Sequence, residues 1–186
     1  MAKVKIKKNN LNRVSKQIKQ ELMKPRNIKT FADTLRKSII DENILRGRSP
    51  VNGQGRFVSY SDSYKQQIRG EVNFSTLPDR VAPFGFENPG LFDKRVTPVN
   101  LKVSGQLLKS FEVSTSTDGL RVQFTDKIAS YHNNGSSFTN RNGNIVKLPK
   151  RQLLPNGPQE KFNRSVTRSF NAKLTDLVKN ILRRTS

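Results

Sequence analysis

The residue types that most often perform acid–base or nucleophilic chemistry are scarce in this sequence. His132 is the single histidine, and the chain contains no cysteine. A general base needs a partner within hydrogen-bonding reach, and the sequence predicts no carboxylate or thiol beside His132. Asp118 and Asp126 fall in predicted turns, and no pair of carboxylates recurs at the spacing of metal ligands. We therefore expect no catalytic residue, no metal site and no cofactor, and we expect that the protein is not an enzyme.

One segment, Gly53-Gln54-Gly55, invites comparison with a phosphate-binding turn. It lacks a third glycine, no strand is predicted before it, and no Lys-Ser or Lys-Thr pair follows it. We expect instead a flexible connecting loop over residues 49–61. This loop leads to Tyr60, Tyr64 and Ile68, whose helical spacing favours packing anchors over a platform on which bases would stack.

Positive charge is the strongest chemical signal in the chain. Lysine and arginine number 35 against 14 acidic residues, which gives a net charge of +21. Residues 1–24 carry eight basic residues and one acidic, and residues 161–186 carry seven and one, whereas residues 60–130 carry nine and eight. Such basic blocks gain free energy near a polyanion because counterions are released. We expect proximity to nucleic acid without sequence specificity; the alternative is a solvated basic face that keeps the protein soluble.

A shorter basic cluster lies between residues 141 and 151, where four cations occur without an acid. Asn142-Gly143 is a strong hairpin turn signal, and residues 136–141 and 144–148 are candidate strands on either side of it. The sequence thus predicts a hairpin with a basic tip. Its cations are our candidates for facing DNA or an acidic partner: Arg141, Lys147, Lys150 and Arg151.

Alternating apolar residues predict a second hairpin at the centre of the chain. Phe111, Val113 and Thr115 alternate with polar residues, and residues 120–124 repeat the pattern after the turn Thr117-Asp118-Gly119. Short helical segments are expected on both sides of this hairpin. The first follows Ser104-Gly105, and the second spans residues 128–132 and stops at Asn134-Gly135.

Helical periodicity predicts three longer helices. The first covers residues 11–22 and ends before Pro25, and the second is capped by Asn27 or Thr30 and stopped by Gly47. The third begins with Pro158 at its first helical position and continues to Ile181.

Two segments are expected to contact neighbouring subunits. Val4 and Ile6 alternate with lysines near the N-terminus, and residues 71–100 form a long insertion with four prolines and four phenylalanines. Exposed phenylalanines are costly in a monomer, so we expect this insertion to order on assembly; the alternative is that it folds back on its own domain. The candidate contact residues are Val4, Ile6, Phe74, Phe84, Phe86 and Phe92.

Four short motifs occur in the order that is typical of the neck and virion-morphogenesis family of tailed phages, and the chain resembles that family from residue 49 to its end. The motifs are Gly55-Arg56-Phe57-x-x-Tyr60-Ser61-x-Ser63-Tyr64-Lys65, Ser104-Gly105-x-Leu107-x-x-Ser110-Phe111, Tyr131-His132-Asn133-x-Gly135 and Leu148-Pro149-x-Arg151-x-x-Leu154. The sequence departs from the family in its longer segment 71–100, and in Gln152 and Leu153, which replace the usual Pro and Phe.

The resemblance implies an α+β fold with a small antiparallel or mixed sheet packed on a long C-terminal helix. A basic N-terminal arm with two helices would occupy residues 1–48, and the neck domain would occupy residues 49–186. The implied function is that of a structural head–tail connector, a homo-oligomeric ring of six or twelve copies around the viral double-stranded DNA. Its partners would be portal or head-completion proteins and tail-terminator or tail-tube proteins. Its location would be the virion, after synthesis in the host cytoplasm.

Two other functions remain open from the sequence. The charge would equally suit a basic nucleic-acid-binding protein that acts as a monomer. The protein is alternatively the tail terminator or the head-closure ring of the same neck. No membrane partner is expected, since the sequence contains no run of eighteen apolar residues.

Overall fold

The computed structural model describes residues 8–62, 65, 99, 101, 106–116, 119–139 and 143–185. The predictions for Val4, Ile6, Arg141 and the four phenylalanines of the insertion concern residues outside these ranges. The described chain is a mixture of helices and strands, which confirms the α+β class.

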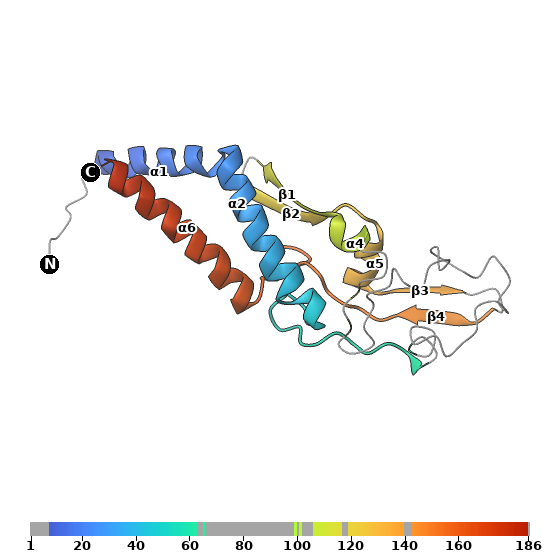
Figure 1. Cartoon of the computed structure of the whole chain (residues 1–186). Coiled ribbons are helices and arrows are strands. Elements are labelled where there is room, and N and C mark those ends of the chain that lie inside the picture. Colours follow the sequence, from blue (N-terminus) through green and yellow to red (C-terminus); the bar gives the residue numbers. More distant parts are fainter. Residues whose placement is uncertain are drawn as a thin grey trace.

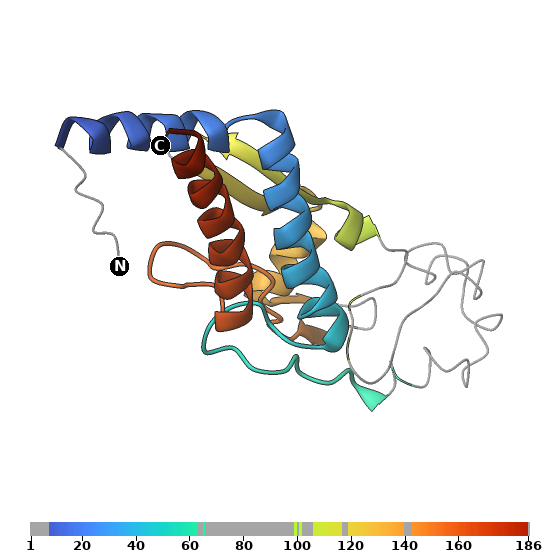
Figure 2. The same ribbon diagram turned by 60° about the vertical axis from the view of Figure 1, so that its left-hand side comes forward.

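Three long helices form one side of the molecule (Figure 1). They are α1 (Lys8–Leu22), α2 (Pro25–Arg36) and α6 (Arg164–Thr185). Helices α2 and α6 lie side by side, and α1 crosses the C-terminal end of α6 (Figures 1 and 2). The helices α1 and α6 are thus present, although α1 begins at Lys8 and not at residue 11, and the first residue of α6 also differs from the prediction.

Helix α2 begins earlier than predicted, because Pro25 occupies its first turn after an extended Lys24. Proline suits this position, since its fixed φ is already helical and its missing N–H would have no helical partner. Neither predicted cap residue caps the helix: the Asn27 amide donates to the Glu21 carbonyl at 2.6 Å, and the Thr30 hydroxyl donates to the Arg26 carbonyl at 2.9 Å.

The end of α2 widens into a π-helical turn over Lys37–Asp41, in which the Glu42 N–H donates to the Lys37 carbonyl at 3.0 Å. Three consecutive residues of this turn, Ser38, Ile39 and Ile40, are buried. A 3₁₀ turn over Ile44–Arg46 follows, and Gly47 at φ 71° ends it, as the sequence predicts. The wide turn leaves a carbonyl available to the buried Asn43, whose amide donates to the Ser38 carbonyl at 2.6 Å.

The strands form two separate antiparallel ribbons within the described residues. Strands β1 (Phe111–Ser116) and β2 (Gly119–Phe124) pair from Phe111↔Phe124 to Ser116↔Gly119, which confirms the central hairpin. Strands β3 (Ser136–Thr139) and β4 (Ile145–Leu148) form the second predicted hairpin. The short helices α4 (Gln106–Lys109) and α5 (Ile128–Asn134) flank the first hairpin as expected.

A single hydrophobic core joins the end of α2, the first hairpin and the start of α6. Ile39, Ile44 and Leu153 are fully buried, and Val166 of α6 is 1% exposed. Phe111 and Phe124 pack edge to face across β1 and β2, with ring centroids 5.4 Å apart. β1 packs on α2, which in turn packs on α6. The expected boundary between residues 48 and 49 stays a prediction, although α2 shares its core with later elements of the chain.

Helix α6 begins at Arg164 and not at Pro158. The chain from Pro158 to Phe162 is engaged elsewhere: the Glu160 N–H donates to the Gly157 carbonyl, and Phe162 pairs with Val51 in an isolated antiparallel bridge. Asn163 then caps the helix, because its side-chain oxygen accepts from the Val166 N–H at 3.2 Å. The asparagine side chain accepts a hydrogen bond from an N–H of the first helical turn, whereas a proline side chain cannot accept one. The helix therefore starts after Asn163, which is the stronger of the two start signals.

The stop of α5 yields a stability prediction. Gly135 has φ 73° and ψ 163°, a conformation that is almost confined to glycine, and an added Cβ would lie 3.2 Å from the Leu148 carbonyl oxygen and 3.3 Å from the Lys150 nitrogen. We expect Gly135→Ala to lower the free energy of unfolding by about 2–4 kcal/mol, measured by urea denaturation. Gly55→Ala is the matched control, because a Cβ there meets nothing within 4 Å; equal losses in both variants would contradict this explanation.

Candidate nucleic-acid interface

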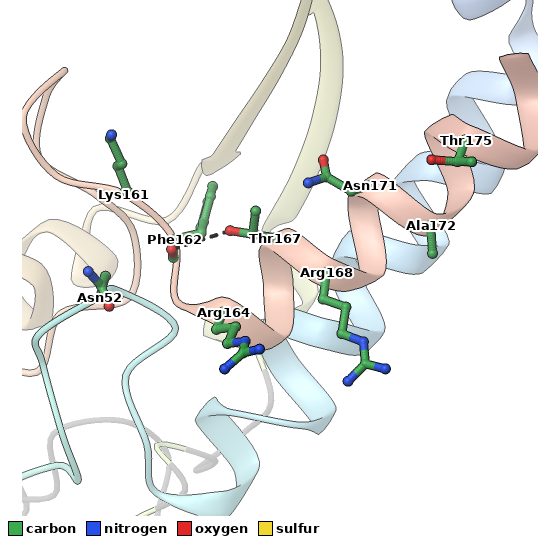
Figure 3. Close-up of a pocket in the computed structure, with 9 residues that line it drawn as sticks. All are labelled: Asn52, Lys161, Phe162, Arg164, Thr167, Arg168, Asn171, Ala172 and Thr175. Atoms are coloured by element: carbon green, nitrogen blue, oxygen red, sulfur yellow. Dashed lines mark hydrogen bonds between the residues drawn. The ribbon is translucent and has the colours of Figure 1, made fainter.

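Two adjoining concave surfaces meet at the N-terminal end of α6. One runs along the first turns of that helix (Figure 3), and the other lies under the loop of residues 48–56. Asn52 and Arg164 line both surfaces, so the two are continuous. Among the described residues that line them, no side chain is acidic. The basic ones define what we call the basic groove: Arg48, Arg56, Lys161, Arg164 and Arg168.

The loop side of the basic groove is closed by a single antiparallel bridge. Arg48 pairs with Arg56, next to hydrogen bonds from the Ser49 N–H to the Gly55 carbonyl at 3.0 Å and from the Phe57 N–H to the Gly47 carbonyl at 2.8 Å. Directly opposed residues place their Cβ atoms about 5 Å apart on one face, and like charges there are unfavourable. An anion between the two arginines would relieve this repulsion.

The helix side of the groove adds two cations at i and i+4. Arg164 and Arg168 project from neighbouring turns of α6 to the same side, whereas Lys161 extends from the preceding loop in another direction (Figure 3). All three residues are exposed. The first turn of a helix also carries the positive end of its dipole, so charge and dipole have the same sign here.

None of these five cations forms an ion pair within the described ranges. The ion pairs found there join Glu21 with Lys24 and Arg26, and Asp62 with Lys65. The hydrogen bond from Lys24, at 2.5 Å, lowers the pKa of Glu21, so that carboxylate is engaged at the junction of α1 and α2. The positive potential of the groove is therefore not neutralised by a described acidic side chain.

Buried hydrogen bonds hold the floor of the groove in place. The Asn163 amide donates to the Asn43 side-chain oxygen at 2.8 Å and to the Ser49 carbonyl at 3.1 Å. The Ser49 hydroxyl in turn donates to the Gln152 carbonyl at 2.7 Å. Asn43, Ser49 and Gln152 are all at least 94% buried. Hydrogen bonds among such buried groups fix the three backbone segments relative to one another, so the floor of the groove is formed before any ligand arrives.

Arg151 does not face a partner, which corrects the sequence prediction. It is 3% exposed, because the chain turns back into the core after β4. Its Nε donates to the Val58 carbonyl at 3.2 Å, and a terminal nitrogen donates to the Ser59 carbonyl at 3.5 Å. Its guanidinium lies 5.0 Å from the centroid of the Tyr60 ring. The planar side chain therefore fixes residues 58–60 by stacking and hydrogen bonding.

The other predicted cations are not brought into the basic groove. Lys147 on β4 and Lys150 just after it are exposed, and neither lines the groove. Arg141 lies outside the described residues. The hairpin cations and the groove cations therefore belong to different surfaces.

His132 is a half-buried residue of α5 whose carbonyl accepts a hydrogen bond from the Arg151 N–H at 2.7 Å. Across the part of the chain that the structure describes, no three acidic or imidazole side chains gather as metal ligands would. In the same part, no helix is both long and apolar enough to cross a bilayer.

No protein-family model, curated protein or solved structure matches this chain. The likeness to the neck family consequently depends on the four short motifs alone, and it stays a prediction.

Sequence reasoning missed the residues of the basic groove. The available signal was the pair Arg48 and Arg56 around a glycine-rich loop, together with the spacing of Lys161, Arg164 and Arg168 at a helix start. No phosphate-binding pattern occurs in the residues that flank this loop in sequence. The helix that completes the groove begins at Arg164, more than a hundred residues later in the chain. That contact is long-range and has no local pattern.

The buried arginine gives a second prediction. We expect Arg151→Ala to lower the free energy of unfolding by about 2–3 kcal/mol, because two carbonyls lose charged donors and Tyr60 loses its stacking partner. Lys150→Ala, at the exposed neighbour, should change it by less than about 0.5 kcal/mol. Chemical denaturation of both variants measures the difference, and an unchanged Arg151→Ala variant would show that this contact is dispensable.

Proposed function

We propose that this chain is a structural, non-enzymatic protein that binds the phosphate backbone of double-stranded DNA, as a ring subunit in the neck of a tailed bacteriophage. The observation that carries the proposal is the basic groove, with five exposed cations that no described acid neutralises. The order of the four motifs supports the neck assignment, and the net charge of +21 supports the proximity to DNA.

The form of the groove favours a polymer backbone over a small molecule. It is an open surface that extends from the loop at Arg48 along α6 to Thr175, and its cations are spread over that length. Phosphate contacts position a protein on DNA without reading sequence. The binding we propose is accordingly electrostatic and uniform across DNA sequences, as a channel through which a whole genome passes would require.

In this proposal the helices and hairpins form the subunit body, in which β1 packs on α2 and α2 packs on the long C-terminal helix, so that α2 joins the basic N-terminal region to this body. The N-terminal residues with Val4 and Ile6, and the insertion 71–100, would reach neighbouring subunits. Six or twelve copies would close into a ring. Closure requires a head-to-tail interface whose rotation per subunit divides a full turn. Portal or head-completion proteins would lie on one side and tail-terminator or tail-tube proteins on the other.

The main alternative is a basic nucleic-acid-binding protein that acts as a monomer, because the groove would serve that role equally well. A second alternative is another ring of the same neck, the tail terminator or the head-closure ring. The two proposals that involve a ring differ from the monomer in assembly state, so size and DNA affinity must be measured together.

The groove makes a prediction about salt. Removing two phosphate-facing cations should weaken binding to every duplex sequence and reduce the slope of log K against log salt by about two, since each contact contributes about 0.9. We expect this for Arg48→Ala/Arg56→Ala, measured by fluorescence anisotropy on two unrelated duplexes over a range of salt concentrations. The control is Arg121→Ala/Lys127→Ala, which removes the same charge from exposed residues outside the groove. Equal slopes in the two variants would place the DNA elsewhere.

The ring makes a separate prediction. Light scattering coupled to size exclusion and electron microscopy of the whole chain, alone and with duplex DNA, should show closed rings of six or twelve copies. A monomer that binds DNA with full affinity would support the nucleic-acid-binding alternative. A chain that neither assembles nor binds DNA would overturn the proposal.

A further inference from the structure

The β3–β4 hairpin exposes apolar side chains on both of its faces. Phe138 is 56% exposed, Ile145 70% and Val146 37%. The register places Phe138 opposite Val146 and Thr139 opposite Ile145, and adjacent pairs point to opposite faces of a ribbon. The hairpin also extends from the body at the end opposite to α1 (Figure 1). Exposed apolar side chains gathered on one projecting element are typical of a docking site.

Both edges of this hairpin are open among the described strands, since β3 and β4 pair only with each other. An exposed edge presents a row of unpaired N–H and C=O groups that can accept another strand. A strand added there would gain main-chain hydrogen bonds and would contact the apolar side chains on whichever face its own apolar residues point to.

The base of the hairpin is held firmly although its strands project. The Asn133 side-chain oxygen accepts from the Leu153 N–H at 2.7 Å and from the Leu154 N–H at 2.9 Å. The Arg151 N–H donates to the His132 carbonyl at 2.7 Å, and Gly135 closely approaches the Leu148 carbonyl. A two-stranded ribbon is marginal in isolation, so these contacts fix its direction. A fixed ribbon binds at a lower entropic cost than a mobile one.

Charge selects among possible occupants. Residues 127–159 contain no acidic residue, and Lys127, Lys147 and Lys150 are exposed, whereas Arg151 is buried and does not contribute to this surface. Edge-to-edge pairing of two copies would bring Lys147 of each hairpin toward the like charges of the other, and lysine on an edge strand opposes such self-pairing. An acidic strand meets no such repulsion. The charge therefore favours an acidic protein partner over a second copy.

We propose that the β3–β4 hairpin docks an acidic partner protein by accepting an extended segment in which apolar and acidic residues alternate. Phe138 and Val146, which share one face, would contact the apolar side chains, and Lys147 on the opposite face would lie near the acidic ones. This goes beyond the proposed function, because it assigns a protein partner to a surface that is separate from the DNA-facing groove and does not require a ring.

The test uses the whole chain and a blocked heptapeptide in which glutamate and valine alternate. We expect binding by anisotropy of the labelled peptide, and protection from hydrogen exchange at residues 136–139 and 145–148. The variant Phe138→Ser/Ile145→Ser/Val146→Ser should weaken binding at least tenfold. The control, Met23→Ser/Leu182→Ser, removes two exposed apolar side chains, one next to the α1–α2 junction and one on α6, and should bind within twofold of the unaltered chain.

Each further outcome decides the matter. Equal binding to the hairpin variant and to the control would overturn the proposal, as would equal binding of an oligoglutamate peptide, which carries charge without apolar contacts. Self-association of the unaltered chain that the hairpin variant loses would assign the surface to a second copy and would also overturn it. The hairpin variant should bind DNA within twofold of the unaltered chain. A wrong docking proposal can therefore be distinguished from a wrong proposal that the basic groove binds DNA.

Discussion

The hydrogen bonds among Asn43, Ser49 and Asn163 connect three segments that are distant in sequence: the end of α2, the glycine-rich loop and the start of α6. Because Asn43 and Ser49 are buried and Asn163 is half-buried, breaking one of these bonds would leave a polar group with little compensation from water. The same junction fixes the cap of α6, through the Asn163 side-chain oxygen, and the floor of the basic groove. The helix pair, the loop and the groove therefore depend on one small polar cluster above the apolar core of Ile39, Ile44 and Val166.

Two surfaces with different chemistry are held by this framework. The basic groove is cationic and open, which suits repeated phosphates. The β3–β4 hairpin carries apolar side chains with lysines, which suits a protein segment of opposite charge. Hydrophobic residues make up only 33% of the sequence, so a protein with this composition buries a small core and exposes apolar groups sparingly. Exposed phenylalanine, isoleucine and valine on one projecting hairpin are for that reason informative about partners.

Local patterns predicted the elements whose signals are local. Alternation gave the hairpin from Phe111 to Phe124, Asn142-Gly143 gave the hairpin of β3 and β4, and Gly135 gave the end of α5. Errors arose where two local signals competed for the start of a helix. For α6 the prediction used Pro158, but the helix starts after Asn163; for α2 it used Asn27 or Thr30, but the helix starts at Pro25. The burial of Arg151 and the assembly of the basic groove depend on contacts between residues about 90 or more positions apart, as in the bond from Arg151 to Val58. No periodicity in a single sequence encodes such contacts.

The π-helical turn over Lys37–Asp41 makes the spacing of the chain as important as its composition. The turn accommodates one residue more than an α-helical turn would, and the helix beyond it keeps its phase; inserting one further residue into α2 would rotate everything after it by about 100° around the helix axis. Ile44 would then leave the core, and Asn43 would point away from Asn163. One added residue would thus uncouple the first helices from the loop that closes the groove, even if every buried side chain kept its identity. Among relatives of this chain, variation in length should accordingly be rarer within α2 than variation in residue type.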